Sequence, residues 1–279
     1  MKAAAPVDLT GRTIIVTGAS PGSIGFETAR ILREWGADVV GTTRKDLELT
    51  DADSVRRFVE RFLATHKRLD VLVNNAGVHL DLRSQWKQPH LVDGHEIHWR
   101  TNYLGTSQVT HLLMPMLIAT AEQTGDARVV NVVSKLHARA TNEQLFSEID
   151  PYNSWVAYGR SKLALIHHAN ELQRRNSANG VQGYSLHPGA VYSNIADRGL
   201  EESRVLGRLR KLAAPLERRA LMSITDGAQT SVHCASSPDA HGGLYYRGVA
   251  PADPSPDALD ATAAARLWDS TQEWLAARS

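Results

Sequence analysis

Short apolar runs rich in Val and Ile alternate along this chain with longer segments in which apolar residues recur at helical spacing. The first pattern is typical of buried strands and the second of amphipathic helices. We predict strands near residues 13–17, 38–43, 70–74, 128–133, 182–186 and 244–247. We predict helices near residues 24–35, 51–66, 92–121, 156–177, 226–236 and 262–277. This alternation predicts an α/β fold, with a Rossmann-like, doubly wound parallel sheet covered by helices on both faces.

A glycine-rich loop follows the first predicted strand and opens the first predicted helix. A strand, a glycine loop and a helix in this order form a dinucleotide-binding turn, in which glycines let the backbone approach a pyrophosphate at the helix N-terminus. An ordinary strand–turn–helix connection is the alternative, and a P-loop is excluded because no Gly-Lys-Ser/Thr closes the motif. The candidate cofactor contacts in this loop are Gly18, Ser20, Gly22, Ser23, Ile24 and Gly25.

Tyr158 and Lys162 lie four residues apart in a predicted helix, so they share one face. An unperturbed tyrosine, with a pKa near 10, is a poor acid or base at neutral pH. We expect the ammonium of Lys162 to lower the pKa of Tyr158. The pair then provides a proton donor and acceptor for carbonyl/alcohol interconversion.

Polar residues end two further predicted strands, at Asn74-Asn75-Ala76-Gly77 and at Ser134. Carboxyl ends of parallel strands are where open α/β sheets bind ligands. With Tyr158 and Lys162, these motifs occur in an order that resembles the short-chain dehydrogenase/reductase family, from about Thr10 to the C-terminal helix. The retinol-dehydrogenase-like group is the most similar. Its pattern is matched by Asp93-Gly94, by residues 101–106, 187–191 and 227–230, and by the 24 positions that separate Ser134 from Tyr158.

The resemblance implies a hydride transfer between a nicotinamide and the carbonyl or alcohol of an apolar small molecule. By this resemblance, Tyr158 handles the proton, Ser134 hydrogen-bonds the reacting oxygen and Lys162 holds the nicotinamide ribose. Asn102 takes the position that supports a relay water in relatives. The remaining cofactor contacts that the resemblance implies are Asn75, Ala76, Gly77, Pro188, Gly189, Val191 and Ser193.

Two places depart from the family pattern. Gly22 and Gly25 are separated by two residues where one is usual, so an extra residue must bulge near the pyrophosphate. Between the strand that ends near Thr43 and the helix that begins near Asp51 there is no room for the usual third helix, because a parallel crossover needs a dozen or more residues. Residues 47–49 should form at most a short edge strand, with Glu48 and Leu49 near the adenine.

Arg44 follows the second predicted strand, next to the position where NAD-preferring folds place an acid. An arginine there accommodates a 2′-phosphate through its fork of donors. We therefore expect NADP(H) to be preferred, with NAD(H) as the weaker alternative. A solvated loop arginine is the competing interpretation.

The amino-acid composition argues against several classes of partner and site. A net charge of +1 without a basic run argues against a nucleic-acid partner, and the single Cys234 excludes an intrachain disulfide. No targeting segment or membrane span is recognisable, so we expect a cytoplasmic location. The histidines lack metal-ligand spacing, and no metal site is predicted. We expect one domain over residues 1–279, and the resemblance implies a homodimer or homotetramer through the helices near 92–121 and 156–177.

Substrate identity should depend on residues 135–156 and on a lid over residues 190–223, since loops at this edge carry specificity. His79, His137 and Trp155 would touch substrate or simply pack near it. Two other function classes stay open. One is a redox-neutral epimerase or dehydratase that uses the same Tyr/Lys pair, and the other is a cofactor-sensing protein without turnover. The complete set of Ser134, Tyr158, Lys162 and Asn102 argues against the sensor.

Overall fold

Six parallel strands form the central sheet of the chain, whose computed structural model describes residues 3–189 and 222–278. Their spatial order is β2-β1-β3-β6-β7-β8. Residues of the inner strands β1, β3 and β6 are buried throughout, as expected for a sheet that is covered on both faces. The strand bounds are β1 (Thr13–Val16), β2 (Asp38–Gly41), β3 (Val71–Asn74), β6 (Ala127–Val132), β7 (Val181–His187) and β8 (Tyr245–Arg247).

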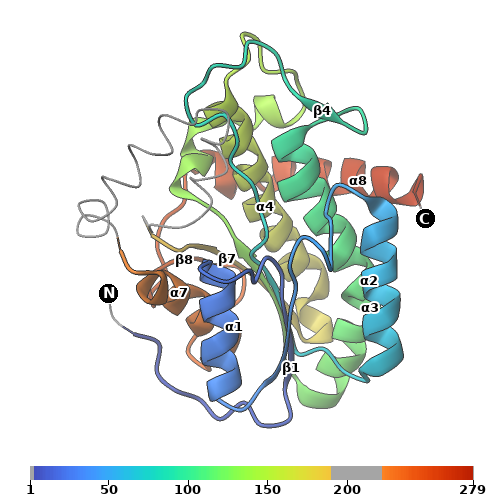
Figure 1. Ribbon diagram of the computed structural model, residues 1–279, viewed down its shortest axis with the longest axis vertical. Helices are drawn as coiled ribbons and strands as arrows, with labels where there is room; N and C mark the ends of the chain where they lie inside the picture. The colour runs from blue at the N-terminus through green and yellow to red at the C-terminus, as the bar shows by residue number, and fades with distance from the viewer. Residues whose placement is uncertain (1–2, 190–221, 279) are drawn as a thin grey trace.

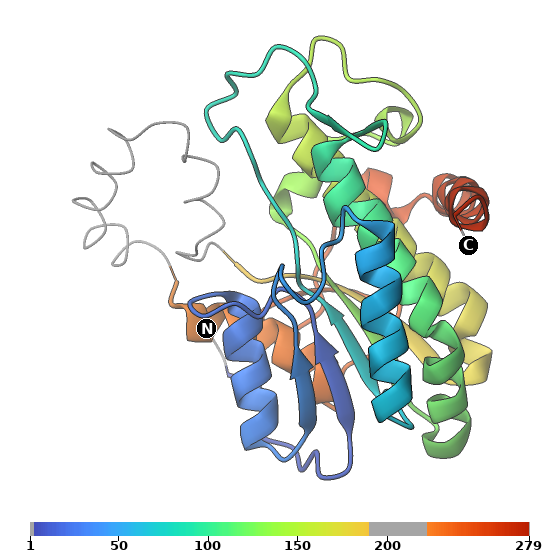
Figure 2. The same cartoon turned by 45° about the vertical axis from the view of Figure 1, so that its right-hand side comes forward.

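Helices cover both faces of this sheet (Figures 1 and 2). On one face lie α1 (Ile24–Glu34) and α7 (Ile224–Ser236), which pack against each other over a core cluster that includes Ile14, Val73 and Tyr184. On the other face lie α2 (Ala52–Thr65), α3 (Thr106–Thr124) and α4 (Ser154–Asn176). The doubly wound α/β fold predicted from the sequence is confirmed.

Side-chain caps begin these helices where the sequence predicts helix starts. Ser23 caps α1, Asp51 caps α2 and Asn153 caps α4, each by accepting hydrogen bonds from backbone N–H groups of the first turn. Such caps satisfy donors that have no partner within the helix. The short helical turns are η2 (Lys135–Arg139), η3 (Glu143–Leu145), η4 (Ser177–Asn179) and η5 (Pro256–Leu259).

The helix predicted near residues 92–121 begins later than expected. Residues 91–96 form an antiparallel hairpin of β4 (Leu91–Val92) and β5 (His95–Glu96), followed by a π-helix, η1 (Trp99–Gly105), that continues into α3. Asp93 and Gly94 take φ values of 54° and 74°, the left-handed conformations that a tight hairpin turn requires. The prediction of a helix at residues 92–96 is therefore wrong, and the Asp-Gly pair is instead the turn of this hairpin.

Between β2 and β3 the structure has one helix, α2, so the predicted loss of the usual third helix is confirmed. The short edge strand allowed for residues 47–49 is not formed, and the chain turns there instead. Leu47 and Leu49 are both buried, and they pack in the core cluster that contains Val55 and Phe58. Hydrophobic anchoring therefore replaces strand pairing at this edge.

The C-terminal helix α8 (Ala261–Ala276) packs against α4 and crosses it at a steep angle (Figure 1). Trp268 on α8 stacks on His168 of α4, with ring centroids 5.6 Å apart. Thr271 shares a hydrogen bond of 2.7 Å with the hydroxyl of Tyr103 on η1. Part of the α4 surface, which we expected at a contact between subunits, is therefore covered by the chain's own last helix.

Candidate active site

The sheet order reverses between β1 and β3, since the chain leaves β1 toward β2 and leaves β3 toward β6. Such a switch point is where doubly wound sheets bind their ligands. A cleft of about 300 Å³ opens there. It is lined by residues of the glycine loop, of the segment after β2, of the end of β3 and of the region around β4 and η1, namely Gly18, Ser20, Ser23, Ile24, Thr43, Arg44, Leu47, Glu48, Leu49, Thr50, Asn75, Ala76, Gly77, Val78, Leu80, Val92, Ile97 and Thr101.

The extra residue of the glycine loop is accommodated by a tight turn. The N–H of Ser23 donates to the carbonyl of Ser20 at 3.1 Å, and Gly22 has a φ of 77°. Pro at the second position and a positive φ at the third are typical of a type II turn. Ser23 then caps α1 by accepting from the N–H of Phe26 at 3.1 Å. The loop therefore places the N-terminus of α1 at the cleft, although its glycines are not spaced as the family pattern has them.

Asn75 holds the glycine loop against the end of β3. Its Nδ2 donates to the carbonyls of Thr17 and Gly18 at 2.8 and 3.1 Å. A Cβ on Gly25 would lie 2.3 Å from that Nδ2, and a Cβ on Gly18 would lie 2.8 Å from the Cα of Ala76. These glycines let the loop pack directly against the end of β3 and leave the N-terminus of α1 free of side chains there, which fits the close approach of a dinucleotide phosphate.

Arg44 and Glu48 line the outer end of the cleft and form an ion pair with each other. Burial raises the pKa of Glu48, but hydrogen bonds from Arg44 and Thr50 outweigh it and leave the pKa below its usual range. The Arg44 side chain is 73% exposed, so its guanidinium can exchange partners. Both residues thus lie at the edge of the cleft where the sequence predicts the adenine end.

Arg100 anchors the outer end of the cleft, although no pattern in the sequence marks it as a functional residue. Its guanidinium is fully buried and donates to the carbonyls of Leu49 and Thr50 at 2.8 and 2.9 Å. The guanidinium also lies over the ring of Trp274, at 5.3 Å from the centroid. Arg100 supplies the donors that strand pairing would otherwise give to these carbonyls.

Ser134 and Tyr158 come together at the carboxyl edge of the sheet. Burial raises the pKa of Tyr158 to about 12 and outweighs the effect of the nearby Ser134 side chain, which lowers this pKa. Ser134 Oγ also accepts from the N–H of Leu136 at 3.2 Å, which fixes its rotamer at the start of η2. The phenol therefore keeps its proton at neutral pH.

Lys162 does not lower the pKa of Tyr158 as the sequence analysis expected. Its ammonium is buried and donates to the carbonyl of Val132 at 3.0 Å, while its nitrogen stays 5.7 Å from the centroid of the phenol ring. Burial lowers the pKa of Lys162 itself to about 8. The ammonium faces Gly77 on the cleft wall, where an added Cβ would lie 3.3 Å from Nζ.

Asn102 lies on the π-helix η1, an irregular turn of a kind that is common at functional sites. Its amide is fully buried. The amide oxygen accepts from the N–H of Val78 at 2.8 Å, and the amide nitrogen donates to the carbonyl of Val78 and to Ser161 Oγ, both at 3.0 Å. Asn102 therefore ties the segment after Gly77 to α4.

The three aromatic candidates for substrate contact have different surroundings. His137 uses both ring nitrogens for packing, since Nδ1 bonds the carbonyl of Ser134 at 2.7 Å and Nε2 accepts from the N–H of Ser255 at 2.9 Å. Trp155 donates to the carbonyl of Leu82 at 3.2 Å. His79 lies directly on the ring of Tyr158, at a centroid distance of 4.1 Å.

Pro188 and Gly189 follow β7, and Gly189 has a φ of 93°. Neither borders the cleft described above. Val191, Ser193 and most of the lid predicted over residues 190–223 lie outside the described residues.

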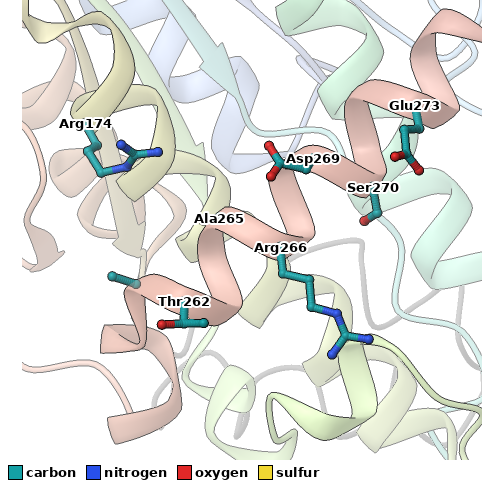
Figure 3. A pocket seen from close by; sticks show the side chains of 8 residues that line it. Arg174, Thr262, Ala265, Arg266, Asp269, Ser270 and Glu273 are labelled. Carbon is teal, nitrogen blue, oxygen red and sulfur yellow. The ribbon is translucent and has the colours of Figure 1, made fainter.

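A larger surface depression, of about 810 Å³, is lined by residues of α8 and by Arg174 of α4 (Figure 3). Two of its charged side chains are ion-paired: Arg174 pairs with Glu171 at 2.7 Å, and Asp269 pairs with Arg175 at 3.2 Å. Arg266 lies over the ring of Phe146. This depression is a solvated face of the molecule rather than a second reaction site.

Residues 43–203 match the family described as short chain dehydrogenase. The chain belongs to the short-chain dehydrogenase/reductase family, in its retinol-dehydrogenase-like group. Human retinol dehydrogenase 12 is 35% identical, over 98% of this chain and 89% of its own length. The matched family region begins after the glycine loop, whose assignment therefore rests on the full-length relatives and on the geometry above.

Solved structures of other proteins share this fold. A crystal structure of an uncharacterised protein from Mycobacterium paratuberculosis superposes with a TM-score of 0.72, at 30% identity and 98% coverage of both chains. A 3-ketoacyl-(acyl-carrier-protein) reductase from Brucella melitensis, solved with NADH, reaches 0.62 at 19% identity, over 85% of this chain and 96% of its own. Among the helices that the structure describes, none is both long and apolar enough to cross a bilayer.

Proposed function

We propose that this protein is an NADP(H)-dependent oxidoreductase that interconverts the carbonyl and alcohol forms of an apolar small molecule. The observation that carries the proposal is the meeting of Ser134 and Tyr158 near buried Lys162, whose ammonium faces Gly77 on the wall of the cleft. Retinol dehydrogenases among the relatives support the carbonyl/alcohol chemistry. Apolar side chains on the cleft wall, such as Leu80, Val92 and Ile97, support an apolar substrate.

A bound nicotinamide supplies or accepts the hydride. Tyr158 holds a proton on its hydroxyl at neutral pH, because burial keeps its pKa near 12, and it gives this proton to the carbonyl oxygen during reduction. Ser134 donates a hydrogen bond to the same oxygen and stabilises its developing charge. Lys162, which faces the cleft wall at Gly77, would hold the nicotinamide ribose.

The NADP(H) preference rests on Arg44. Its guanidinium borders the outer end of the cleft and is mostly exposed, so a 2′-phosphate can compete with Glu48 for it. An arginine binds phosphate through paired donors, whereas the ribose hydroxyls of NAD(H) gain less from it. Glu48 would then hold Arg44 in place before the cofactor arrives.

The test is turnover by wild type and Tyr158→Phe with NADPH and a panel of apolar aldehydes and ketones, followed at the reduced-nicotinamide absorbance band. We expect Tyr158→Phe to lower kcat by about 100-fold or more, the usual scale of general acid–base catalysis, with NADPH binding unchanged. Tyr103→Phe is the matched control, since it removes a buried phenol hydroxyl that bonds Thr271 instead. Near-normal turnover by Tyr158→Phe rejects the assignment. Product formed without net absorbance change indicates the redox-neutral class.

A further inference from the structure

His79 and Tyr158 form a flat stack inside the site. Their ring centroids are 4.1 Å apart and their planes differ by 12°. Trp155 meets the same imidazole edge-on, with centroids 4.7 Å apart. His79 is only 5% exposed, so these rings are its surroundings rather than solvent. The imidazole is therefore part of the packing that holds the phenol.

The backbone on both sides of His79 is clamped by η1 and the residues just before it. Asn102 bonds both the N–H and the carbonyl of Val78, at 2.8 and 3.0 Å. His98 Nε2 accepts from the N–H of Leu80 at 2.9 Å. Fixing the residues before and after His79 leaves its side chain little freedom. We call residues 78–82 the strap.

His98 is itself held by a buried carboxylate. Because its Nε2 accepts from Leu80, the ring proton sits on Nδ1 and is donated to Glu96 at 2.7 Å. Glu96 also accepts from the hydroxyl of Tyr152 at 3.1 Å and from the N–H of Trp99 at 3.0 Å. The clamp at Leu80 is therefore a chain of satisfied hydrogen bonds.

The strap is also tied to the helix that carries the phenol. Ser154 Oγ donates to the carbonyl of Asp81 at 2.8 Å, and Trp155 Nε1 donates to the carbonyl of Leu82 at 3.2 Å. Both residues lie in the first turn of α4, one turn before Tyr158. His79 and Tyr158 are thus fixed relative to each other by the same helix.

The stacked imidazole carries no charge at neutral pH. Burial, with smaller effects from His98 and Lys162, lowers the pKa of His79 to about 3. Its Nε2 is buried without a hydrogen-bond partner among the described residues. An unpaired buried polar atom costs about 1–3 kcal/mol, so the ring is kept there despite that nitrogen. The imidazole therefore acts here through the packing of its flat ring on Tyr158 and Trp155, and not through a charge or a hydrogen bond of Nε2.

We propose that His79 is a positioning residue for Tyr158. The flat imidazole ring of His79 holds the phenol in the plane that keeps the phenol hydroxyl beside Ser134. The inference rests on the proposed function, because it takes Tyr158 as the proton donor and acceptor. It assigns the strap a task beyond linking β3 to the hairpin. It also accounts for the hydrogen bonds that Asn102 and His98 both make with the backbone of the strap.

Two variants separate ring shape from ring nitrogen. His79→Phe keeps a flat ring and should retain kcat within about threefold, whereas His79→Leu should lower kcat about tenfold or more, the scale of a small misplacement of a reacting group. For both variants KM for the carbonyl and the Kd for NADPH should stay near wild type. His167→Leu is the control, since that buried histidine bonds Asn142 instead. Equal losses in the Phe and Leu variants, or full activity in His79→Leu, overturn the proposal.

A second measurement does not need turnover. In protein labelled with ¹³C-tyrosine, the Tyr158 ring signal is assigned by its loss in Tyr158→Phe. It should be shifted upfield in wild type and His79→Phe and return toward the free value in His79→Leu. A signal that is the same in all three proteins overturns the stack. If wild type turns over no carbonyl while these shifts appear as expected, the proposed function fails and the stack stands.

Discussion

The ammonium of Lys162 donates to the carbonyl of Val132 from inside the protein, at 3.0 Å. Burial lowers its pKa from 10.5 to about 8, a difference that corresponds to a charge penalty on the order of 3 kcal/mol. This loss of stability is fully present below about pH 8, where Lys162 is protonated in both the folded and the unfolded chain. Between about pH 8 and 10.5 the unfolded chain binds more protons, so stability contributed by this site rises with pH.

Lys162→Met should therefore stabilise the cofactor-free protein at pH 7. The variant removes the buried charge and loses one hydrogen bond, for a net gain of about 2 kcal/mol in the free energy of unfolding. Thermal unfolding at pH 7 and pH 10 checks this, and the gain should shrink at the higher pH. A Tm below wild type at pH 7 would show that the Val132 bond outweighs the charge. The variant should have lost turnover, as expected where function opposes stability.

Arg44→Ala should raise KM for NADPH about tenfold or more and leave KM for NADH nearly unchanged, because only the 2′-phosphate needs the guanidinium. Steady-state kinetics with both cofactors measures the two values. Lys45→Ala is the matched control, since its side chain is exposed on the same turn and does not line the cleft. Equal changes with NADPH and NADH would mean that Arg44 is only a solvated loop residue.

The main elements of this fold were readable from the sequence because local patterns specify them. The run at Thr13–Val16 and the glycines after it predict a strand and a phosphate-binding turn without reference to the rest of the chain. The four-residue spacing of Tyr158 and Lys162 likewise places both on one helix face. These predictions needed only neighbours in sequence.

Other features depend on residues far apart in the chain and could not be read locally. An arginine is usually exposed, so nothing in the sequence marks Arg100 as a fully buried donor to Leu49 and Thr50. The stack of His79 on Tyr158 joins segments that only the sheet brings together. The pKa of Tyr158 is raised and not lowered, because burial has the largest effect on it, and a spacing motif does not report burial.

Arg100→Met should lower the free energy of unfolding by about 2–4 kcal/mol, because two buried carbonyls lose charged donors. It should also weaken NADPH binding, since Leu49 and Thr50 line the cleft. Urea unfolding and cofactor titration measure both effects. Arg57→Met is the control, as its side chain is 59% exposed and should change stability by less than about 0.5 kcal/mol. If Arg100→Met is as stable as wild type, the hydrogen bonds from Arg100 to Leu49 and Thr50 do not stabilise the fold.

Gly25→Ala should weaken NADPH binding even though alanine favours helices by about 1 kcal/mol over glycine. The new Cβ would lie 2.3 Å from Nδ2 of Asn75 and 2.7 Å from the carbonyl oxygen of Gly18, so the amide must leave the carbonyls of Thr17 and Gly18 and the glycine loop must shift. Asn75→Ala releases the same loop by removing the amide. Because the Gly18 carbonyl still meets the new Cβ, the double variant should bind NADPH more weakly than Asn75→Ala alone, but by less than the sum of the two single losses, since both changes act on one loop. Cofactor titration of the three variants decides it, because fully additive losses would show that Gly25 and Asn75 affect NADPH binding independently.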